Sequence, residues 1–402
     1  MTDDKVDFDI ATQLVHAGER QPAPPGQPVS TPLYATTTFT YASMEETDKV
    51  FGGEVPGYVY TRHGNPTTAG LEEAMRTIER GTAACVYSSG MAALHAALLV
   101  SDLKSGDTVL ASQDLYGATT SLLMNIFTLF GIKTVTADFA NLDQLQTTAE
   151  ETGPRVLIAE TISNPLLKLC DVPAVADIAR RVKARLIIDN TFATPYLCRP
   201  LEHGADLVVH SATKFLGGHG DATGGVVISR DEMDRPALIS VMKLVGGVLG
   251  VFQGHEIMRG LKTLALRVER QCTNARELAA RIAEHPAVAR VYFPGLNDEA
   301  EAQLVGRLLR KPHAGALVSI ELRENNRDAT FRFMNALKLV VRSTSLGDVF
   351  TSALHPATAS HRDLTPARRR TLGISDGLVR ISVGIENVND IIGDIEQALR
   401  GA

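Results

Sequence analysis

Short apolar runs alternate with longer amphipathic stretches between about residue 65 and residue 258. Helical stretches such as Gly70–Glu79 and Val172–Val182 accompany the runs. Continuous apolar runs are typical of strands buried on both faces of a parallel sheet. We therefore expect an α/β domain with a mainly parallel central sheet and functional groups at the carboxyl ends of its strands. The expected parallel strands are Thr108–Ala111, Val156–Ala159, Leu186–Ile188, Leu207–Val209 and Val226–Ile228.

From residue 259 to residue 402 the pattern changes to a mixture of helices and isolated strands. This mixture predicts a second, smaller α+β domain. The expected elements are a long helical stretch, two strands and two further helices: Glu256–Glu284, Ala316–Leu322, Leu378–Val383, Ala329–Leu337 and Val388–Leu399.

Residues 1–64 show no regular pattern. Gln21–Ser30 is rich in proline and glycine, which favours an extended arm. An arm of this length is expected to reach a neighbouring subunit. The acidic N-terminus lacks the apolar core that a signal peptide has. The most apolar stretch, Met91–Val100, is about half as long as a membrane span. A cytoplasmic protein is expected.

Composition narrows the function classes. The 402 residues are 44% hydrophobic, which is enough for a large core, and a net charge of −6 indicates neither nucleic acid nor an anionic membrane as a partner. The four cysteines form no CxxC pair, so neither a disulfide framework nor a zinc cluster is predicted, and no metal site is expected.

Lys214 follows the apolar run Leu207–Val209 and precedes a glycine-rich loop. Position alone leaves two interpretations equally open: a solvated surface charge, or a buried amine with a lowered pKa that forms a Schiff base. Ser211 and Thr213 alternate on one face beside it and could donate to a phosphate. Alternatively, these hydroxyls bond the backbone at the strand end.

Two further positions accompany Lys214. Asp189 ends the run Leu186–Ile188 and either caps the next turn or pairs with a pyridinium nitrogen, which keeps that ring an electron sink. It precedes Lys214 by 25 residues, one βαβ step. The segment Ser88–Met91 links an apolar run to a helix start and predicts an anion site, although many βα turns look alike.

Several familiar motifs are incomplete. Gly218-His219-Gly220 lacks the last glycine of a dinucleotide fingerprint, and no Walker A run is present. His361–Leu364 imitates a kinase catalytic loop, but Arg368 stands where asparagine is needed. Ser211–Lys214 matches SxxK without the SDN and KTG partners of β-lactamases and penicillin-binding proteins.

Taken together, these segments resemble the Cys/Met-metabolism family of pyridoxal-phosphate (PLP) enzymes, also called the trans-sulfuration family. The most diagnostic block is Ala205–Lys214 with Gly218–Asp221, and the resemblance extends from Thr12–Gly18 to Leu378–Gly384. It implies the aspartate-aminotransferase-like PLP-dependent transferase fold of type I. It also implies pyridoxal 5'-phosphate as cofactor and an amino acid as substrate.

The resemblance implies roles for individual residues. Lys214 is expected to form the Schiff base and to carry protons between Cα, Cβ and the cofactor carbon, while Asp189 pairs with the pyridine nitrogen. Tyr116 is expected to stack on the ring and to act as the acid toward the γ leaving group. The expected phosphate ligands are Gly90, Met91, Ser211 and Thr213, with Tyr60 and Arg62 of the neighbouring subunit; Arg380, Ser345 and Asn164 are expected to hold the substrate carboxylate.

The shared ligands imply a dimer, and family members are usually tetramers built from two such dimers. Phe333–Leu337, Leu346–Asp348 and Gly373–Arg380 are most similar to methionine γ-lyases. A γ-lyase acting on methionine, homocysteine, canavanine or an O-acylhomoserine is therefore expected. A γ-replacing O-acylhomoserine sulfhydrylase or cystathionine γ-synthase stays open, as do, less favoured, a cystathionine γ-lyase and a non-catalytic relative.

Three positions near the expected substrate side chain bear on this choice. Thr344 stands where similar cystathionine enzymes typically carry glutamate, which argues against a cystathionine synthase or lyase. Ala118 replaces a cysteine usual in methionine γ-lyases, and Lys243-Leu244 replaces their Lys-Asp. These departures leave the natural γ substituent open.

Overall fold

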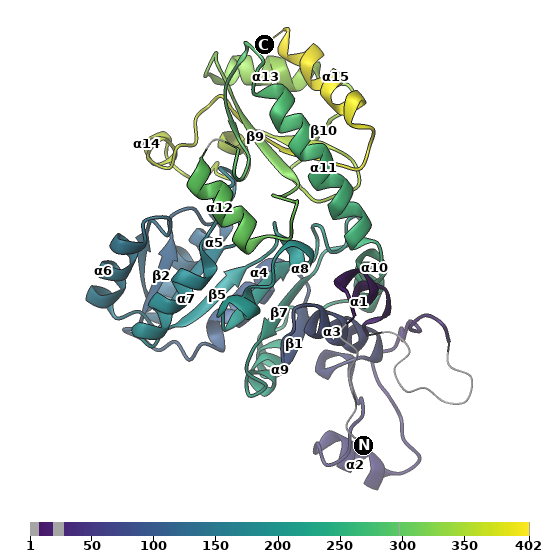
Figure 1. The fold of residues 1–402 in the computed structure, drawn as a ribbon. Helices are drawn as coiled ribbons and strands as arrows, with labels where there is room; N and C mark the ends of the chain where they lie inside the picture. Colours follow the sequence, from purple (N-terminus) through teal and green to yellow (C-terminus); the bar gives the residue numbers. More distant parts are fainter. Residues whose placement is uncertain (1–7, 19–27, 297, 402) are drawn as a thin grey trace.

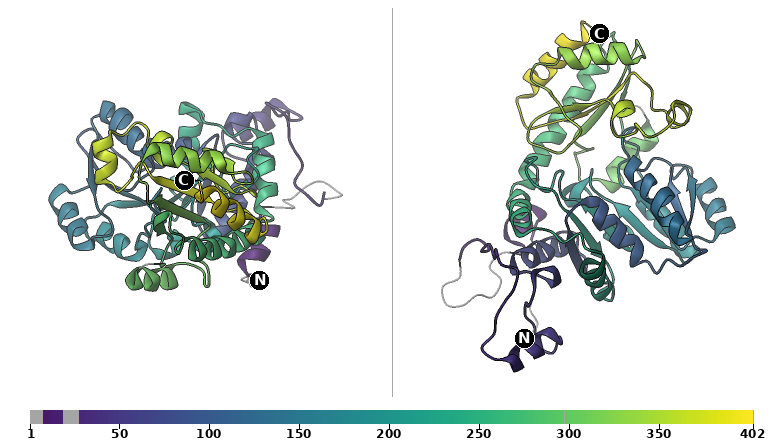
Figure 2. Two further views of the ribbon diagram at one scale, coloured as in Figure 1. Left: turned by 90° about the horizontal axis from the view of Figure 1, so that it is seen from above. Right: turned by 180° about the vertical axis from the view of Figure 1, so that it is seen from behind.

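The computed structural model describes residues 8–18, 28–296 and 298–401. These residues form a larger lobe, a smaller lobe and an N-terminal segment that projects away from both (Figure 1; Figure 2, right). Residues 21–27 of the proline-rich stretch, and the first seven residues, lie outside the described ranges. No described helix combines the length and the apolar composition that a membrane crossing requires.

The larger lobe is built on a sheet of seven strands within the described residues. The strand order is β1-β7-β6-β5-β4-β2-β3, and all strands except β7 run in the same direction. This confirms the expected type I fold with a mainly parallel sheet. The strands are β1 (Ala83–Tyr87), β2 (Thr108–Ser112), β3 (Lys133–Ala137), β4 (Val156–Glu160), β5 (Arg185–Asp189), β6 (Leu207–Ser211) and β7 (Gly225–Ser229).

Helices cover both faces of this sheet because its strands alternate their apolar side chains between two cores. On β5, Leu186 and Ile188 belong to the core beneath α3 and α7, whereas Ile187 belongs to the core beneath α4 and α9. Both faces are therefore apolar, as the continuous runs predicted. The larger helices of this lobe are α3 (Pro66–Ile78), α4 (Gly90–Leu99), α6 (Leu142–Thr152), α7 (Val172–Arg181), α9 (Asp234–Val245) and α10 (Val251–Leu261), with short α5 (Gly117–Ser121) and α8 (Thr194–Leu197).

Strand β7 corrects one expectation, because Val226–Ile228 is antiparallel to both of its neighbours. The connection from β6 to β7 contains no helix. A parallel return requires a crossover, usually a helix, so this connection brings the chain back in the opposite direction. Lys214 lies in this connection.

The smaller lobe has a five-stranded sheet in the order β10-β11-β12-β9-β8, counted over the described residues. The single stretch expected at Glu256–Glu284 is two helices, which are separated at Lys262 and Thr263. The second of them, α11, runs along the smaller lobe from the junction of the lobes (Figure 1). The elements are β8 (Val288–Tyr292), β9 (Leu317–Leu322), β10 (Val341–Arg342), β11 (Ser352–Leu354) and β12 (Leu378–Ser382), with α11 (Leu264–Ile282), α12 (Glu299–Leu308), α13 (Arg327–Ala336), α14 (Pro366–Thr371) and α15 (Val388–Leu399).

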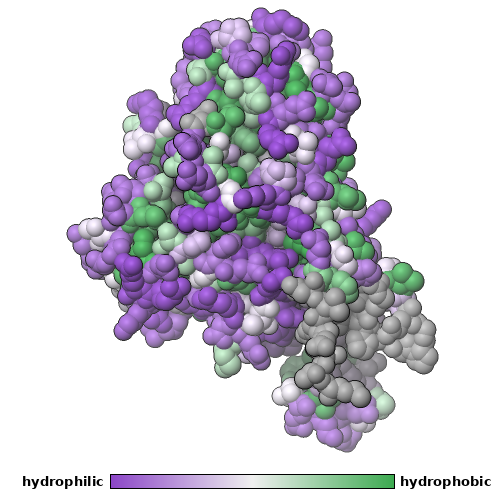
Figure 3. All heavy atoms as spheres, viewed as in Figure 1, coloured by the Kyte–Doolittle hydropathy of each residue, from purple (hydrophilic) through white to green (hydrophobic). Residues whose placement is uncertain are grey.

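The expectation of an irregular segment before residue 65 is wrong in part. Helices α1 (Ile10–His16) and α2 (Met44–Phe51) form there, and each begins at a side-chain cap, Asp9 or Ser43. Helix α2 buries none of its residues and stands on the projection. In Figure 3 this projection shows apolar atoms among polar ones.

Candidate active site

A cavity of about 480 Å³ lies at the carboxyl ends of β4, β5 and β6, beside the N-terminus of α4. This is the edge at which a parallel sheet gathers its functional groups. Ten of the predicted site residues line the cavity: Gly90, Met91, Tyr116, Asn164, Asp189, Ser211, Thr213, Lys214, Thr344 and Arg380. A larger cavity of about 930 Å³ lies elsewhere, lined by residues such as Leu166, Arg290 and Tyr292, and contains none of these ten.

Lys214 lies in this cavity three residues beyond the end of β6. Its Nζ donates a hydrogen bond to Ser345 Oγ at 3.1 Å, which brings Ser345 to the site from the smaller lobe. Burial lowers the pKa of Lys214, the positive charge of Arg380 lowers it further, and Asp348 acts in the opposite direction. A lysine of this kind is a better nucleophile and proton carrier than a solvated one.

Asp189 is positioned by Thr191, a residue that sequence reasoning missed. The carboxylate Oδ1 accepts the Thr191 backbone N–H at 2.9 Å and also the Thr191 hydroxyl, which leaves Oδ2 to accept another bond. The Thr191 hydroxyl oxygen also accepts the backbone N–H of Ser211 at 2.8 Å, so it joins the ends of β5 and β6. Burial raises the pKa of Asp189, while the two bonds from Thr191 lower it. A cationic ring nitrogen at Oδ2 would favour the charged carboxylate.

The start of α4 faces Ser211 at close range. A Cβ atom at Gly90 would lie 2.8 Å from Ser211 Cβ, so only glycine allows this approach. The helix is capped by Ser89, and its first backbone N–H groups suit an anion such as phosphate. The Thr213 hydroxyl donates to the Gly224 main-chain oxygen at 3.2 Å and accepts the Gly224 backbone N–H at 3.0 Å, which is the backbone bonding given above as the alternative to phosphate binding. Thr213 also lines the cavity.

Arg380 is buried at the substrate end of the cavity, with 2% of its surface exposed. Its Nη1 donates to Asn164 Oδ1 at 2.8 Å, and its Nη2 donates to the main-chain oxygen of Ser345 at 3.2 Å. Burial lowers the pKa of Arg380 to about 10. Its buried Nε has no partner among the described residues, which fits a guanidinium that holds an anionic ligand.

Glu160 is a second residue that sequence reasoning missed. It ends β4 directly opposite Asp189 in the sheet register, and its side chain lines the cavity. Its two carboxylate oxygens accept the backbone N–H groups of Tyr116 at 2.6 Å and Asn164 at 3.2 Å. Burial raises its pKa, and the neighbouring charge of Asp189 adds to the effect. Its place after the run Val156–Ala159 was the available signal, because Asp189 follows its own run in the same way.

Five predicted positions are not among the residues that line this cavity, although one of them, Ser345, bonds the Lys214 amine. Tyr60 is 41% exposed, and Arg62 is exposed and donates to the main-chain oxygen of Lys243 at 2.6 Å. Ala118 lies in α5, and Leu244 is 82% exposed near the end of α9. Within one protomer, Tyr60, Arg62 and Leu244 are therefore exposed and do not line this cavity.

Comparisons with known proteins find similarity over nearly the whole chain. Residues 11–400 match the family described as Cys/Met metabolism PLP-dependent enzyme. The chain is 41% identical to an L-methionine gamma-lyase of Pseudomonas putida, over 98% of each chain, and 38% identical to the cystathionine beta-lyase MetC of Bacillus subtilis, over 98% of this chain and 97% of that one. It also superposes on cystathionine gamma synthase from Xanthomonas oryzae pv. oryzae in complex with cystathionine, with a TM-score of 0.91, 34% identity and 98% of each chain covered.

Proposed function

Because the chain belongs to the Cys/Met metabolism family of PLP-dependent enzymes, we propose that it is a γ-lyase acting on an L-amino acid with a heteroatom leaving group at Cγ. The family consists of lyases and transferases of the trans-sulfuration type, so the chain is a PLP-dependent enzyme whose substrates are amino acids. Methionine or homocysteine is the first substrate proposed. Canavanine or an O-substituted homoserine comes next.

The charges of the cavity carry this proposal. Its charged lining residues, within the described part of the chain, are Glu160, Asp189, Lys214 and Arg380. Each has an assigned contact or a proposed role, so none is left to bind a second charged group at the far end of a substrate. Thr344, Leu346 and Ala359 line the cavity without charge. An uncharged γ substituent such as a methylthio group suits this lining better than the second amino-acid end of cystathionine.

The residues present fit PLP. The α4 N-terminus at Gly90 and Met91, with Ser211 and Thr213, would hold its phosphate, Asp189 its ring nitrogen and Lys214 its aldehyde carbon. When bound, the cofactor supplies an electron sink for the carbanions that form at Cα and Cβ. Tyr116 would stack on the ring.

The protein groups would then perform the remaining steps. Arg380, with Asn164 and Ser345, would hold the substrate α-carboxylate. The Lys214 amine would remove a proton from Cα and another from Cβ, since its lowered pKa leaves more of it neutral. The Tyr116 hydroxyl would donate a proton to the γ heteroatom as its bond to Cγ breaks. The γ group would leave as a thiol or other protonated group, a proton would return to Cγ, and addition of water would release ammonia and a 2-oxo acid, which is 2-oxobutanoate when the substrate is methionine.

A substrate panel tests the reaction. The enzyme loaded with PLP (the loaded enzyme) is incubated with methionine, homocysteine, canavanine, O-acetylhomoserine and cystathionine, with and without an added thiol. The products 2-oxobutanoate and homoserine are then measured. We expect 2-oxobutanoate from methionine or homocysteine without added thiol. If no substrate gives 2-oxobutanoate or homoserine while a thiol adduct accumulates, the enzyme is a γ-replacing transferase and the proposal is wrong.

We further propose that two subunits share each site and that two such dimers form a tetramer. Residues 1–64 would reach the neighbouring subunit, residues 65–258 would bind PLP and residues 259–402 would form the small domain. Tyr60 and Arg62 support this, because both are exposed and neither lines the cavity of its own protomer. There they would complete the partner's phosphate site, and Tyr60 would also approach the partner's substrate.

A further inference from the structure

Glu160 connects the two ends of the candidate active site. It contacts Tyr116, which lies 44 positions earlier, and Asn164, which bonds Arg380 at 2.8 Å. We propose that Glu160 is a positioning residue, which transmits substrate-carboxylate binding at Asn164 and Arg380 to the placement of Tyr116. This inference rests on the proposed function, since it uses the roles assigned to those three residues.

The geometry makes this carboxylate a rigid link. Each oxygen is held by a different backbone N–H group, at 2.6 Å for Tyr116 and 3.2 Å for Asn164, and the side chain is buried. The bond from Tyr116 is shorter than the usual range for N–H to oxygen bonds, so it leaves little freedom between the two groups. A shift of the Asn164 backbone on ligand binding therefore moves the shared carboxylate, and the Tyr116 backbone moves with it.

The surroundings argue against a role limited to folding. Glu160 ends its strand beside Asp189 in the register, and two carboxylates at neighbouring strand ends repel each other. A neutral side chain at position 160 could also accept backbone N–H groups, so that task alone does not require a second carboxylate beside Asp189. The charge has a use here, because Glu160 favours the positive form of the buried Arg380 guanidinium.

Asp394 provides a matched comparison in the smaller lobe. It is also buried, and its carboxylate accepts the backbone N–H groups of Lys338, Leu339 and Val340. It is not among the residues that line the candidate site. Asp394→Asn therefore has the structural consequences of replacing a buried backbone acceptor by an amide, without touching the site.

Glu160→Gln separates the two roles. The amide retains one acceptor oxygen and places an NH₂ group against the other backbone N–H, so one of the two bonds is lost. We expect kcat/KM for the best substrate to fall about ten- to a hundred-fold, as loss of a bond to a charged group predicts, and that for Asp394→Asn to stay within about twofold.

The decisive readout is hydrogen exchange of the loaded protein, measured in the peptide that contains Tyr116. The probes are L-norleucine, which has no γ leaving group, and pentylamine, which is the same chain without the carboxylate. In wild type and Asp394→Asn we expect norleucine, but not pentylamine, to slow exchange there at least threefold. In Glu160→Gln we expect norleucine to lose this effect while it still binds.

The inference is overturned if norleucine protects the Tyr116 peptide equally in wild type and Glu160→Gln, or if pentylamine protects it as well as norleucine does. If Glu160→Gln does not fold, Glu160→Asp is used, because its shorter side chain cannot reach both N–H groups, and the same outcomes apply. Failure of the wild-type protein to bind the cofactor or norleucine, seen in its visible absorbance, contradicts the proposed function instead.

Discussion

Arg380 and Asn164 join the two lobes at the candidate site through a hydrogen bond of 2.8 Å from the guanidinium Nη1 to the side-chain oxygen Oδ1. Arg380 belongs to β12 in the smaller lobe, and Asn164 follows β4 in the larger one. The proposed carboxylate clamp therefore exists only when the lobes are packed against each other. Loss of this contact changes substrate binding without removing any group proposed to hold the cofactor.

We expect Arg380→Lys to lower kcat/KM by about a hundredfold or more, because an ammonium group cannot make the two parallel bonds of a guanidinium to a carboxylate. The visible absorbance of the bound cofactor should persist. Steady-state kinetics and an absorbance spectrum check both parts. Arg281→Lys, an exposed arginine paired with Glu396, is the control and should behave as wild type. Loss of the cofactor spectrum in Arg380→Lys would contradict the separation of the two roles.

The lowered pKa of Lys214 has a consequence for the protein without cofactor. Because the folded pKa lies below the unfolded value of 10.5, the unfolded chain binds more protons between the two values, and stability rises with pH across that window. Below the folded pKa the full penalty of burying the charge is present. Lys214→Met removes that penalty, so the variant should be more stable than wild type at neutral pH, by a margin that shrinks as the pH rises toward 10.5.

Urea unfolding of both apoproteins at several pH values measures this margin, and their difference cancels the other titrating groups. A margin that does not change with pH would show that the Lys214 amine is not desolvated in the folded protein.

Mixing two inactive variants tests the shared site. Lys214→Ala lacks the proposed Schiff-base amine and Arg62→Ala lacks the proposed phosphate ligand of the partner. A hybrid dimer would contain one site with both defects and one intact site. We therefore expect subunit exchange to restore up to about a quarter of the wild-type activity in an equal mixture, because half of the dimers are hybrids. Activity that stays at the level of the separate variants despite verified exchange would place Arg62 outside the partner's site.

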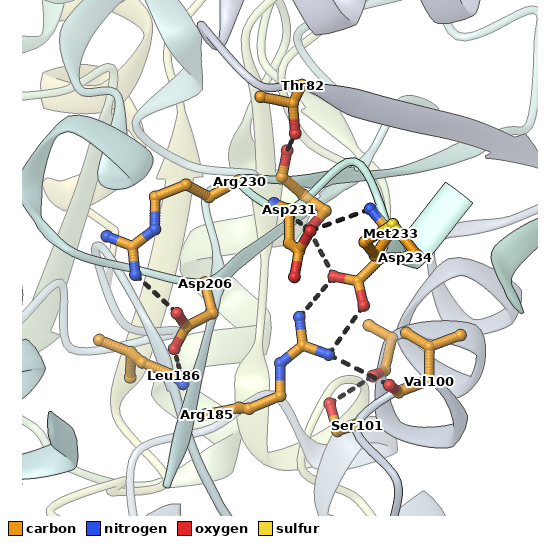
Figure 4. Close-up of polar contacts among 12 residues, drawn as sticks. Thr82, Val100, Ser101, Arg185, Leu186, Asp206, Arg230, Asp231, Met233 and Asp234 are labelled. Carbon is orange, nitrogen blue, oxygen red and sulfur yellow. Dashed lines mark hydrogen bonds and ion pairs between the residues drawn. The ribbon is translucent and has the colours of Figure 1, made fainter. Parts of the chain in front are cut away.

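A cluster of charged and polar side chains with no proposed catalytic role joins the strand ends that lie opposite the candidate site in the same sheet. Asp234, at the start of α9, accepts two bonds from the Arg185 guanidinium (Figure 4). It also accepts one from the Ser229 hydroxyl. Arg185 starts β5, and Ser229 ends β7. We expect Asp234→Asn to lower the free energy of unfolding by roughly 1–3 kcal/mol, since it leaves Arg185 partly buried without its counter-charge.

Thermal or urea unfolding of the loaded protein measures this loss. Asp177→Asn breaks an exposed pair with Arg180 and should change stability by less than about 0.5 kcal/mol. Activity per folded molecule should be unchanged in both. An equal effect of the two substitutions would mean that burial adds nothing to the Asp234 cluster.

The sequence predicts the parts of this structure that local pattern determines. The buried strands β2, β4, β5 and β6 follow from their apolar runs, whereas β3 does not, because Lys133–Ala137 is a partly exposed edge strand with alternating polar residues. Asp189 and Lys214 are predicted because each follows such a run. Glu160 follows its own run in the same way and could have been predicted, although its pairing with Asp189 arises from strand register. Thr191 could not, because its contacts join two strand ends that meet only in the folded protein.

The pairing of β1 with β7 also sets an order in time. Cys85 lies opposite Val227, so 142 further residues must be synthesised before β1 gains its only partner strand among the described residues. At about 5–20 residues per second this takes on the order of ten seconds, during which an apolar strand stays unpaired in the nascent chain. The sheet that carries the candidate active site is thus completed late in translation, and β1 is an unpaired apolar segment that needs protection from aggregation until then.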